Sequence, residues 1–126
     1  MLENRKHMRY EDVARIEAPD ICIFPGVLVD VSEQGCKVRF SVPVSVDMDN
    51  DYELKLYPTH KSSVCSFVLI GHPVWNKTTT TYSEMGFKIL HSPGKKHFLE
   101  YISNLVAYEN EIEEENISYS RLCLSI

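Results

Sequence analysis

Residues 27–40 read VLVDVSEQGCKVRF, and this stretch decides the fold. It holds two short runs in which apolar side chains alternate with a second set of side chains, which is polar except for Leu28. Alternation of this kind is typical of a β-strand that buries one face and exposes the other. The inward set that it predicts consists of Val27, Val29 and Val31 in the first run, and Val38 and Phe40 in the second.

A short turn, Glu33-Gln34-Gly35, separates the two runs. Gly35 can adopt the positive φ that a hairpin turn often requires. The whole stretch therefore predicts a β-hairpin, with Asp30 and Ser32 as neighbouring polar side chains on its outward face. Polar groups on such a face can serve solubility alone, so their meaning depends on the rest of the chain.

Composition sets the first limits on function. The chain has 126 residues, of which 44% are hydrophobic and 25% are charged. This length suits one domain that buries a core without metals or disulfides. The net charge is −5, and five of the 18 acidic residues lie between positions 109 and 115. The other acidic residues equal the 13 basic residues in number, and a neutral body argues against broad binding to duplex nucleic acid.

The four cysteines are far apart and form no Cys-x-x-Cys pair, so neither a zinc site nor a disulfide framework is expected. We expect three of them, Cys22, Cys36 and Cys65, to be small and mostly buried hydrophobic side chains. The polar start of the chain does not resemble a signal peptide, and no long apolar span follows. These features predict a cytoplasmic, reduced protein.

Further strands are predicted on both sides of the hairpin. The run 13–24 is interrupted near Pro19, and the run 63–75 contains Gly71 and Pro73, which suggest a bulge or bend. Residues 52–57 and 82–90 are also strand-like, and 76–81 form a polar hairpin tip. Many short strands with turns between them are typical of an antiparallel barrel or sandwich.

The spacing of apolar residues changes after residue 92. Ser92 is predicted as a helix N-cap, with Pro93 at the first helical position. Apolar residues then recur at intervals of three and four, as in an amphipathic helix: Phe98, Tyr101, Ile102, Leu105 and Val106.

Catalytic motifs are absent from the sequence. No nucleophile elbow, phosphate-binding glycine loop or zinc-binding helix is present, and the five histidines are scattered. The acidic loop 47–51 lacks the glycine and terminal glutamate of an EF-hand. We therefore predict that the protein is not an enzyme and carries no metal or cofactor.

Two separated motifs remain, and together they resemble the signatures of the PilZ domain family. The first is Arg5-Lys6-His7-Met8-Arg9, which matches R-x-x-x-R before the first strand. The second is Asp30-Val31-Ser32-Glu33-Gln34-Gly35, which matches [D/N]-x-S-x-x-G. The similarity continues through 73–75, 85–87 and the closing helix, and covers about residues 4–108.

This resemblance implies a mainly β fold, a six-stranded antiparallel β-barrel of the PilZ-like, split-barrel type with a C-terminal α-helix. It also implies that the protein binds the bacterial second messenger cyclic di-GMP. The domain would consist of a flexible basic arm over 1–12, a barrel over 13–91 and a helix over 92–115, followed by a tail over 116–126. We expect a stand-alone receptor without an attached output domain, which would signal to a partner protein through ordering of its arm.

The resemblance implies ligand-binding roles for Arg5, Arg9, Asp30, Ser32 and Gly35. Guanidinium groups suit phosphate oxygens and the O6/N7 edge of guanine, whereas a carboxylate suits its N1–H and N2–H₂ edge. Second-tier candidates are Asn4, Lys6 and Trp75. Asn4 stands where similar domains often carry a further arginine, which favours one bound ligand molecule over an intercalated pair.

Two other functions remain open. One is a protein-interaction adaptor on the same fold that binds no nucleotide. Members of the PilZ family that work in this way typically lack the arginine and Asp-x-Ser residues, which this chain retains. The other is a small nucleic-acid-binding barrel of OB type, which would require a basic strand face rich in aromatic residues.

Overall fold

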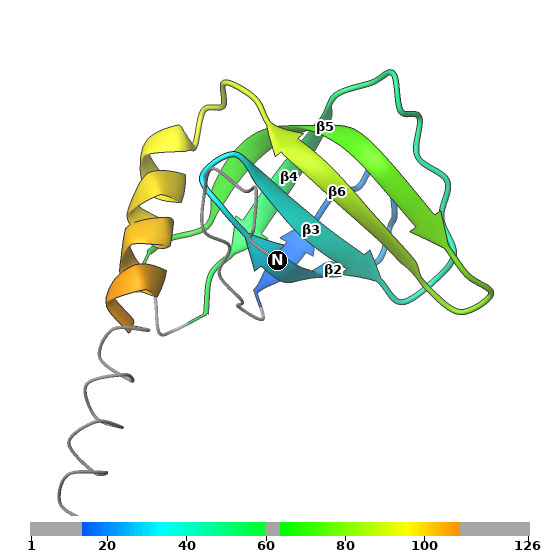
Figure 1. Cartoon of the computed structure of the whole chain (residues 1–126), viewed down its shortest axis with the longest axis horizontal. Coiled ribbons are helices and arrows are strands. Elements are labelled where there is room, and N and C mark those ends of the chain that lie inside the picture. Colours follow the sequence, from blue (N-terminus) through cyan, green and yellow to red (C-terminus); the bar gives the residue numbers. More distant parts are fainter. Residues whose placement is uncertain (1–13, 60–63, 109–126) are drawn as a thin grey trace, which may run out of the picture.

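Six strands form a closed antiparallel barrel in the computed structural model, which describes residues 14–59 and 64–108 (Figure 1). The order around the barrel is β1-β2-β3-β6-β5-β4, and β4 pairs with β1 to close it. This confirms the predicted six-stranded antiparallel barrel with a C-terminal helix. The strands are β1 (Arg15–Glu17), β2 (Gly26–Val31), β3 (Gly35–Phe40), β4 (Tyr52–Tyr57), β5 (Phe67–Thr78) and β6 (Ser83–Ile89).

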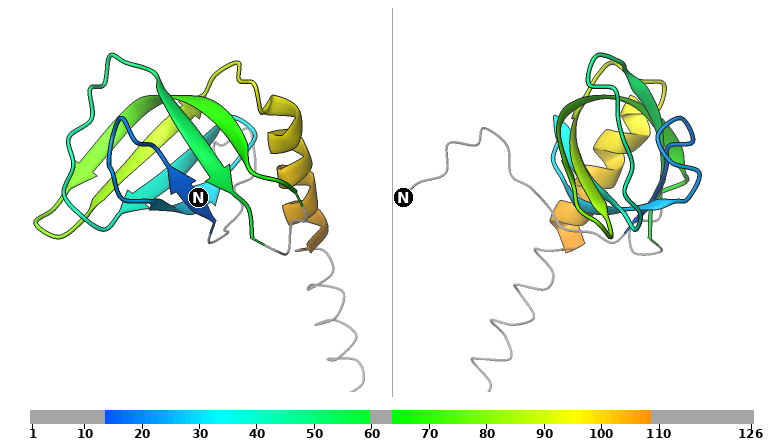
Figure 2. Two further views of the ribbon diagram at one scale, coloured as in Figure 1. Left: turned by 180° about the vertical axis from the view of Figure 1, so that it is seen from behind. Right: turned by 90° about the vertical axis from the view of Figure 1, so that its right-hand side faces the viewer.

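The C-terminal helix, described over residues 95–108, closes one end of the barrel (Figures 1 and 2). Its apolar face is buried, with Phe98 and Tyr101 fully enclosed. Both rings pack against Phe67 at the start of β5, at centroid separations of 6.1 Å and 5.9 Å. The helix thus completes the hydrophobic core that the inward side chains of the strands begin.

The helix begins later than the predicted N-cap. The first i→i−4 bond runs from the amide of Phe98 to the carbonyl of Gly94, so Gly94 and not Ser92 takes the cap position. The buried Ser92 Oγ instead accepts a hydrogen bond from the Ile70 amide at 2.8 Å and donates one to the Leu90 carbonyl at 2.6 Å. The serine therefore joins two chain segments at the end of the barrel.

The predicted inward set of β2 is wrong in part. Val27 is 42% exposed and Leu28 is buried, the reverse of the prediction. The register with β3 shifts between Leu28 and Asp30, so Val29 is an extra residue in a β-bulge. After the bulge Val31 faces the core, whereas Asp30 is turned outward.

The hairpin turn also differs from its prediction. Ser32 is 4% exposed and does not lie on the outward face. Its Oγ accepts a hydrogen bond from the Gln34 amide at 3.4 Å and contacts the Gly35 carbonyl at 3.5 Å. Gly35 is the first residue of β3 and does not have the predicted positive φ; a Cβ there would lie 2.7 Å from the carbonyl oxygen of Phe87. Close approach of β3 to β6 therefore requires the glycine.

The other strands follow the predicted pattern in part. The strand predicted over 13–24 is shorter than expected, since β1 ends at Glu17 and residues 18–25 lie outside any strand. β4 has the predicted bounds, and the predicted irregularity in β5 is present as a register shift between Pro73 and Trp75. β5 continues to Thr78, so the hairpin tip is shorter than predicted. Cys22 and Cys36 are buried as predicted, but Cys65 is exposed because β5 begins only at Phe67.

Candidate functional site

A row of four residues crosses the outer face of four neighbouring strands. Asp30 of β2 pairs with Lys37 of β3, Lys37 pairs with Gly86 of β6, and Gly86 pairs with Trp75 of β5. Two β-bulges contribute to this register, one at Val29 and one between Pro73 and Trp75. Bulges re-aim the side chains that follow them, so both ends of the row depend on a local irregularity of the sheet.

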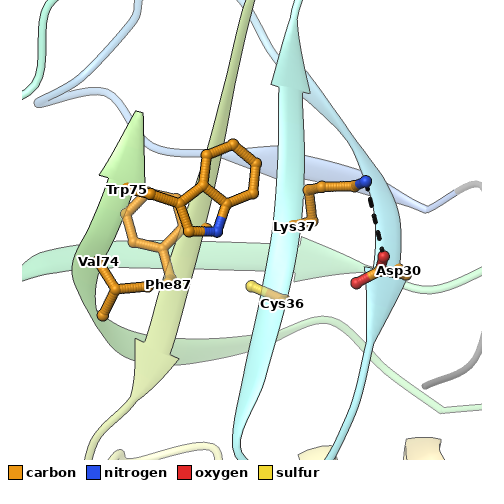
Figure 3. A pocket seen from close by; sticks show the side chains of 7 residues that line it. Asp30, Cys36, Lys37, Val74, Trp75 and Phe87 are labelled. Carbon is orange, nitrogen blue, oxygen red and sulfur yellow. Dashed lines mark ion pairs between the residues drawn. The ribbon is translucent and has the colours of Figure 1, made fainter. Parts of the chain in front are cut away.

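The row borders a hollow of about 260 Å³ (Figure 3). Trp75 forms one side, and Lys37 and Asp30 form the other. Gly86 lies between them in the row and contributes no side chain. Cys36, Val74 and Phe87 complete the lining. The hollow therefore combines an aromatic surface with charged groups of both signs.

The indole of Trp75 occupies the space above Gly86. A Cβ added to Gly86 would collide with the indole Nε1, Cε2 and Cδ1 atoms. Figure 3 shows the ring lying across β6 toward β3. Trp75 is 40% exposed, so the ring is seated on the strand while part of its surface remains open to a ligand.

Asp30 and Lys37 form the charged side of the hollow. The Lys37 Nζ lies 3.9 Å from the Asp30 Oδ2, and the two side chains are 32% and 20% exposed. This separation is an ion-pair contact but is too long for a hydrogen bond. The ammonium of Lys37 therefore retains its hydrogen-bonding capacity toward a third group.

A neighbouring cation on β3 is already engaged. The Arg39 guanidinium donates to the Glu84 Oε2 from Nε at 2.8 Å, and its Cζ lies 4.3 Å from the centre of the Tyr82 ring. Both interactions fix Arg39 against its own strand neighbours. Lys37 is thus the cation that β3 presents to the hollow.

The residues predicted for the site are only partly brought together. Asp30 and Trp75 face the same hollow, whereas Ser32 and Gly35 maintain the turn beside it and do not line it. Asn4, Lys6, Arg5 and Arg9 lie outside the described residues, so their placement stays a prediction.

Lys37 and Gly86 were missed by the sequence analysis. The predicted alternation already sets Lys37 opposite the inward Val38, but it does not assign Lys37 to a site. No local signal identifies Gly86 as its neighbour, since the two residues meet only through the pairing of β3 with β6.

Neither a metal cluster nor a membrane-spanning helix is present in the described residues. They contain no group of three or more His, Cys, Asp or Glu side chains placed to hold a metal ion. Within the same residues, no helix has both the length and the apolar character needed to cross a membrane.

Comparison with known proteins gives a match at the level of structure. No family model matches the sequence, and no curated protein matches it. A solved structure of the Bacillus subtilis inhibitor of motility (MotI/DgrA) is similar, with a TM-score of 0.64 and 10% sequence identity. The match covers 86% of this chain and 53% of that chain, so the chain spans about half of the Bacillus protein's length. At this identity the likeness establishes the fold, in agreement with the fold that the PilZ resemblance implies.

Proposed function

We propose that the protein is a cytoplasmic receptor that binds cyclic di-GMP on the outer face of β2, β3, β6 and β5. The observation that carries the proposal is the cross-strand row, in which the Asp30 carboxylate and the Trp75 ring border one hollow. A guanine base needs both features, a flat apolar surface for stacking and an acceptor for its N1–H and N2–H₂ groups.

The arm supplies the charge that the hollow lacks. Cyclic di-GMP carries two phosphates, whereas Lys37 is the one cation among the described residues that line the hollow, and Asp30 offsets its charge. Arg5 and Arg9 are separated by one helical turn in sequence, a spacing that lets both guanidinium groups reach one ligand. In this proposal the barrel binds the base and the arm binds the phosphates.

Signalling requires that the bound state differ from the free state on the surface. Ordering of the arm over the ligand is a change of this kind, and a partner protein would recognise it. The similar Bacillus protein is named as an inhibitor of motility, so a component of the motility apparatus is the first partner to test.

Calorimetry with the purified full chain tests the proposal. Saturable binding of cyclic di-GMP at micromolar concentration is expected, and an absence of heat together with an absence of binding in a second assay would overturn it. NMR titration then measures the number of ligands per chain and the ordering of residues 1–12.

A second candidate function is a protein-interaction adaptor that binds no nucleotide. Two exposed apolar side chains in the loop between β1 and β2 favour it, Ile23 at 86% and Phe24 at 57% exposure. The same calorimetric experiment separates the two candidates, because an adaptor would give no signal with cyclic di-GMP.

A further inference from the structure

Lys37 lies beside the proposed guanine acceptor without being hydrogen-bonded to it. Its Nζ is 3.9 Å from the Asp30 Oδ2, and its Cα is in register both with Asp30 on β2 and with Gly86 on β6. Figure 3 shows the Lys37 side chain extending from β3 toward Asp30, on the side of the hollow opposite Trp75. An acceptor and a donor therefore stand next to each other at one edge of the hollow.

This pair matches the order of groups on one edge of guanine. The Watson–Crick edge of guanine presents N2–H₂ and N1–H as donors, followed by O6 as an acceptor. A carboxylate accepts from the two donors, and an adjacent ammonium donates to O6. Adenine carries an amino group at position 6, which is a donor and faces an ammonium unfavourably.

We infer that Lys37 is a specificity-determining residue that donates a hydrogen bond to O6 of the guanine whose N1–H and N2–H₂ groups bind Asp30. The inference rests on the proposed function and assigns to β3 a contact that neither sequence motif contains.

The ion pair with Asp30 also holds the Lys37 ammonium near the place where O6 binds. When the base binds, its N1–H and N2–H₂ groups donate to Asp30, and these hydrogen bonds replace the contact with Lys37 that is weakened. The ammonium then moves toward O6 without becoming an uncompensated charge in a partly buried site. The Trp75 ring on the far side limits how the base slides along the row.

The test compares Lys37→Met with the unmodified full chain for three ligands, cyclic di-GMP, cyclic di-IMP and cyclic di-AMP. Inosine keeps O6 and N1–H but lacks the N2 amino group. Loss of a charge-assisted hydrogen bond should weaken cyclic di-GMP and cyclic di-IMP by the same factor, about ten- to a hundredfold. The affinity for cyclic di-AMP should not fall. The ratio of the affinity for cyclic di-GMP to that for cyclic di-AMP should therefore decrease by the same factor.

Two variants serve as controls. Lys37→Arg keeps a charged donor and should retain most of the preference for guanine. Lys55→Met removes the same charge from an exposed strand position on β4, where the ammonium lies 5.3 Å from the centre of the Tyr57 ring, and should change none of the three affinities. Because Lys37→Met removes the ion-pair contact with Asp30, thermal unfolding of each variant should be measured beside binding, to show that the affinities compare folded proteins.

Each other outcome has a definite meaning. Equal weakening of all three ligands would assign Lys37 to a phosphate and overturn the O6 contact. Unchanged affinities in Lys37→Met would also overturn it, while leaving the proposed function intact. Failure of the unmodified protein to bind cyclic di-GMP would overturn the proposed function and this inference with it.

Discussion

The indole ring of Trp75 on β5 lies directly over Gly86 on β6, in space that any other residue at position 86 would fill with its Cβ. The two residues are cross-strand neighbours, so the packing of the ring depends on the absence of a side chain opposite it. This relationship fixes the aromatic side of the candidate site. Tryptophan fluorescence reports on this packing, because Trp75 is the only tryptophan in the chain.

Gly86→Ala should displace the Trp75 ring. The new methyl group would overlap the indole, and overpacking of this kind costs about 1–3 kcal/mol of stability. The displaced ring should show a shifted fluorescence emission maximum in the folded protein. Gly35→Ala is the matched control, since its Cβ would crowd the Phe87 carbonyl instead. It should lower stability without shifting the emission maximum. A Gly86→Ala emission spectrum identical to that of the unmodified protein would contradict the packing of Trp75 over Gly86.

Trp75→Ala should weaken binding of cyclic di-GMP. Stacking of a base on an aromatic side chain contributes about 1–3 kcal/mol by alanine substitution. Trp75→Phe keeps a flat ring and should restore part of the affinity. Val27→Ala removes an exposed apolar side chain from β2 outside the hollow and should have little effect. Equal losses of affinity for Val27→Ala and Trp75→Ala, measured by calorimetry, would show that the Trp75 ring makes no specific contact with the base.

The sequence predicts the barrel well because its inward side chains follow a strict period. β4 illustrates this, since YELKLY alternates throughout and the strand begins and ends where the alternation does. β2 shows the limit. VLVDV begins with three consecutive apolar residues, and the bulge at Val29 reverses the orientation of the residues before it, so Leu28 and not Val27 faces the core. A bulge depends on the partner strand, which the local pattern does not contain.

The candidate site shows the same limit in another form. Asp30 is found through its motif, but its neighbours Lys37 and Trp75 come from the pairing of strands that are distant in sequence. The motif also assigns Ser32 to the ligand, whereas its buried hydroxyl contacts the turn. Short motifs identify positions in a family, and only the register shows which of those positions share one surface.

Ser92→Ala should destabilise the end of the barrel that the helix closes. The Ser92 Oγ satisfies the Ile70 amide and the Leu90 carbonyl, and its side chain is buried. Buried groups left without a partner cost about 1–3 kcal/mol, which urea denaturation would measure directly. Ser41→Ala, at an exposed position after β3, should change stability by less than about 0.5 kcal/mol. Equal stability of the two variants would show that water replaces the Ser92 hydroxyl.

Asp30→Ala should reduce the discrimination between cyclic di-GMP and cyclic di-IMP. The unmodified protein should prefer guanine because the carboxylate accepts from N2–H₂, a group that inosine lacks. Without the carboxylate that preference should disappear, and affinity for cyclic di-GMP should fall by about 1.5–3 kcal/mol. Glu84→Ala is a suitable control, since it removes a carboxylate that binds Arg39 on the same face. A preference for guanine that survives in Asp30→Ala would exclude Asp30 as the reader of the N2 amino group.

Arg5→Ala and Arg9→Ala should each weaken cyclic di-GMP by about 1.5–3 kcal/mol, because each removes charge-assisted hydrogen bonds to the ligand. The loss should be the same for cyclic di-AMP to the extent that the arm binds phosphate, which distinguishes these variants from Asp30→Ala. Arg15→Ala is the control: this arginine lies over Tyr57 at 4.1 Å and pairs with Glu17 at 3.7 Å, so it has partners of its own on β1 and β4. It should leave affinity nearly unchanged. If Arg5→Ala and Arg9→Ala bind as tightly as the unmodified chain while Trp75→Ala does not, the barrel alone holds the ligand and the arm has another role.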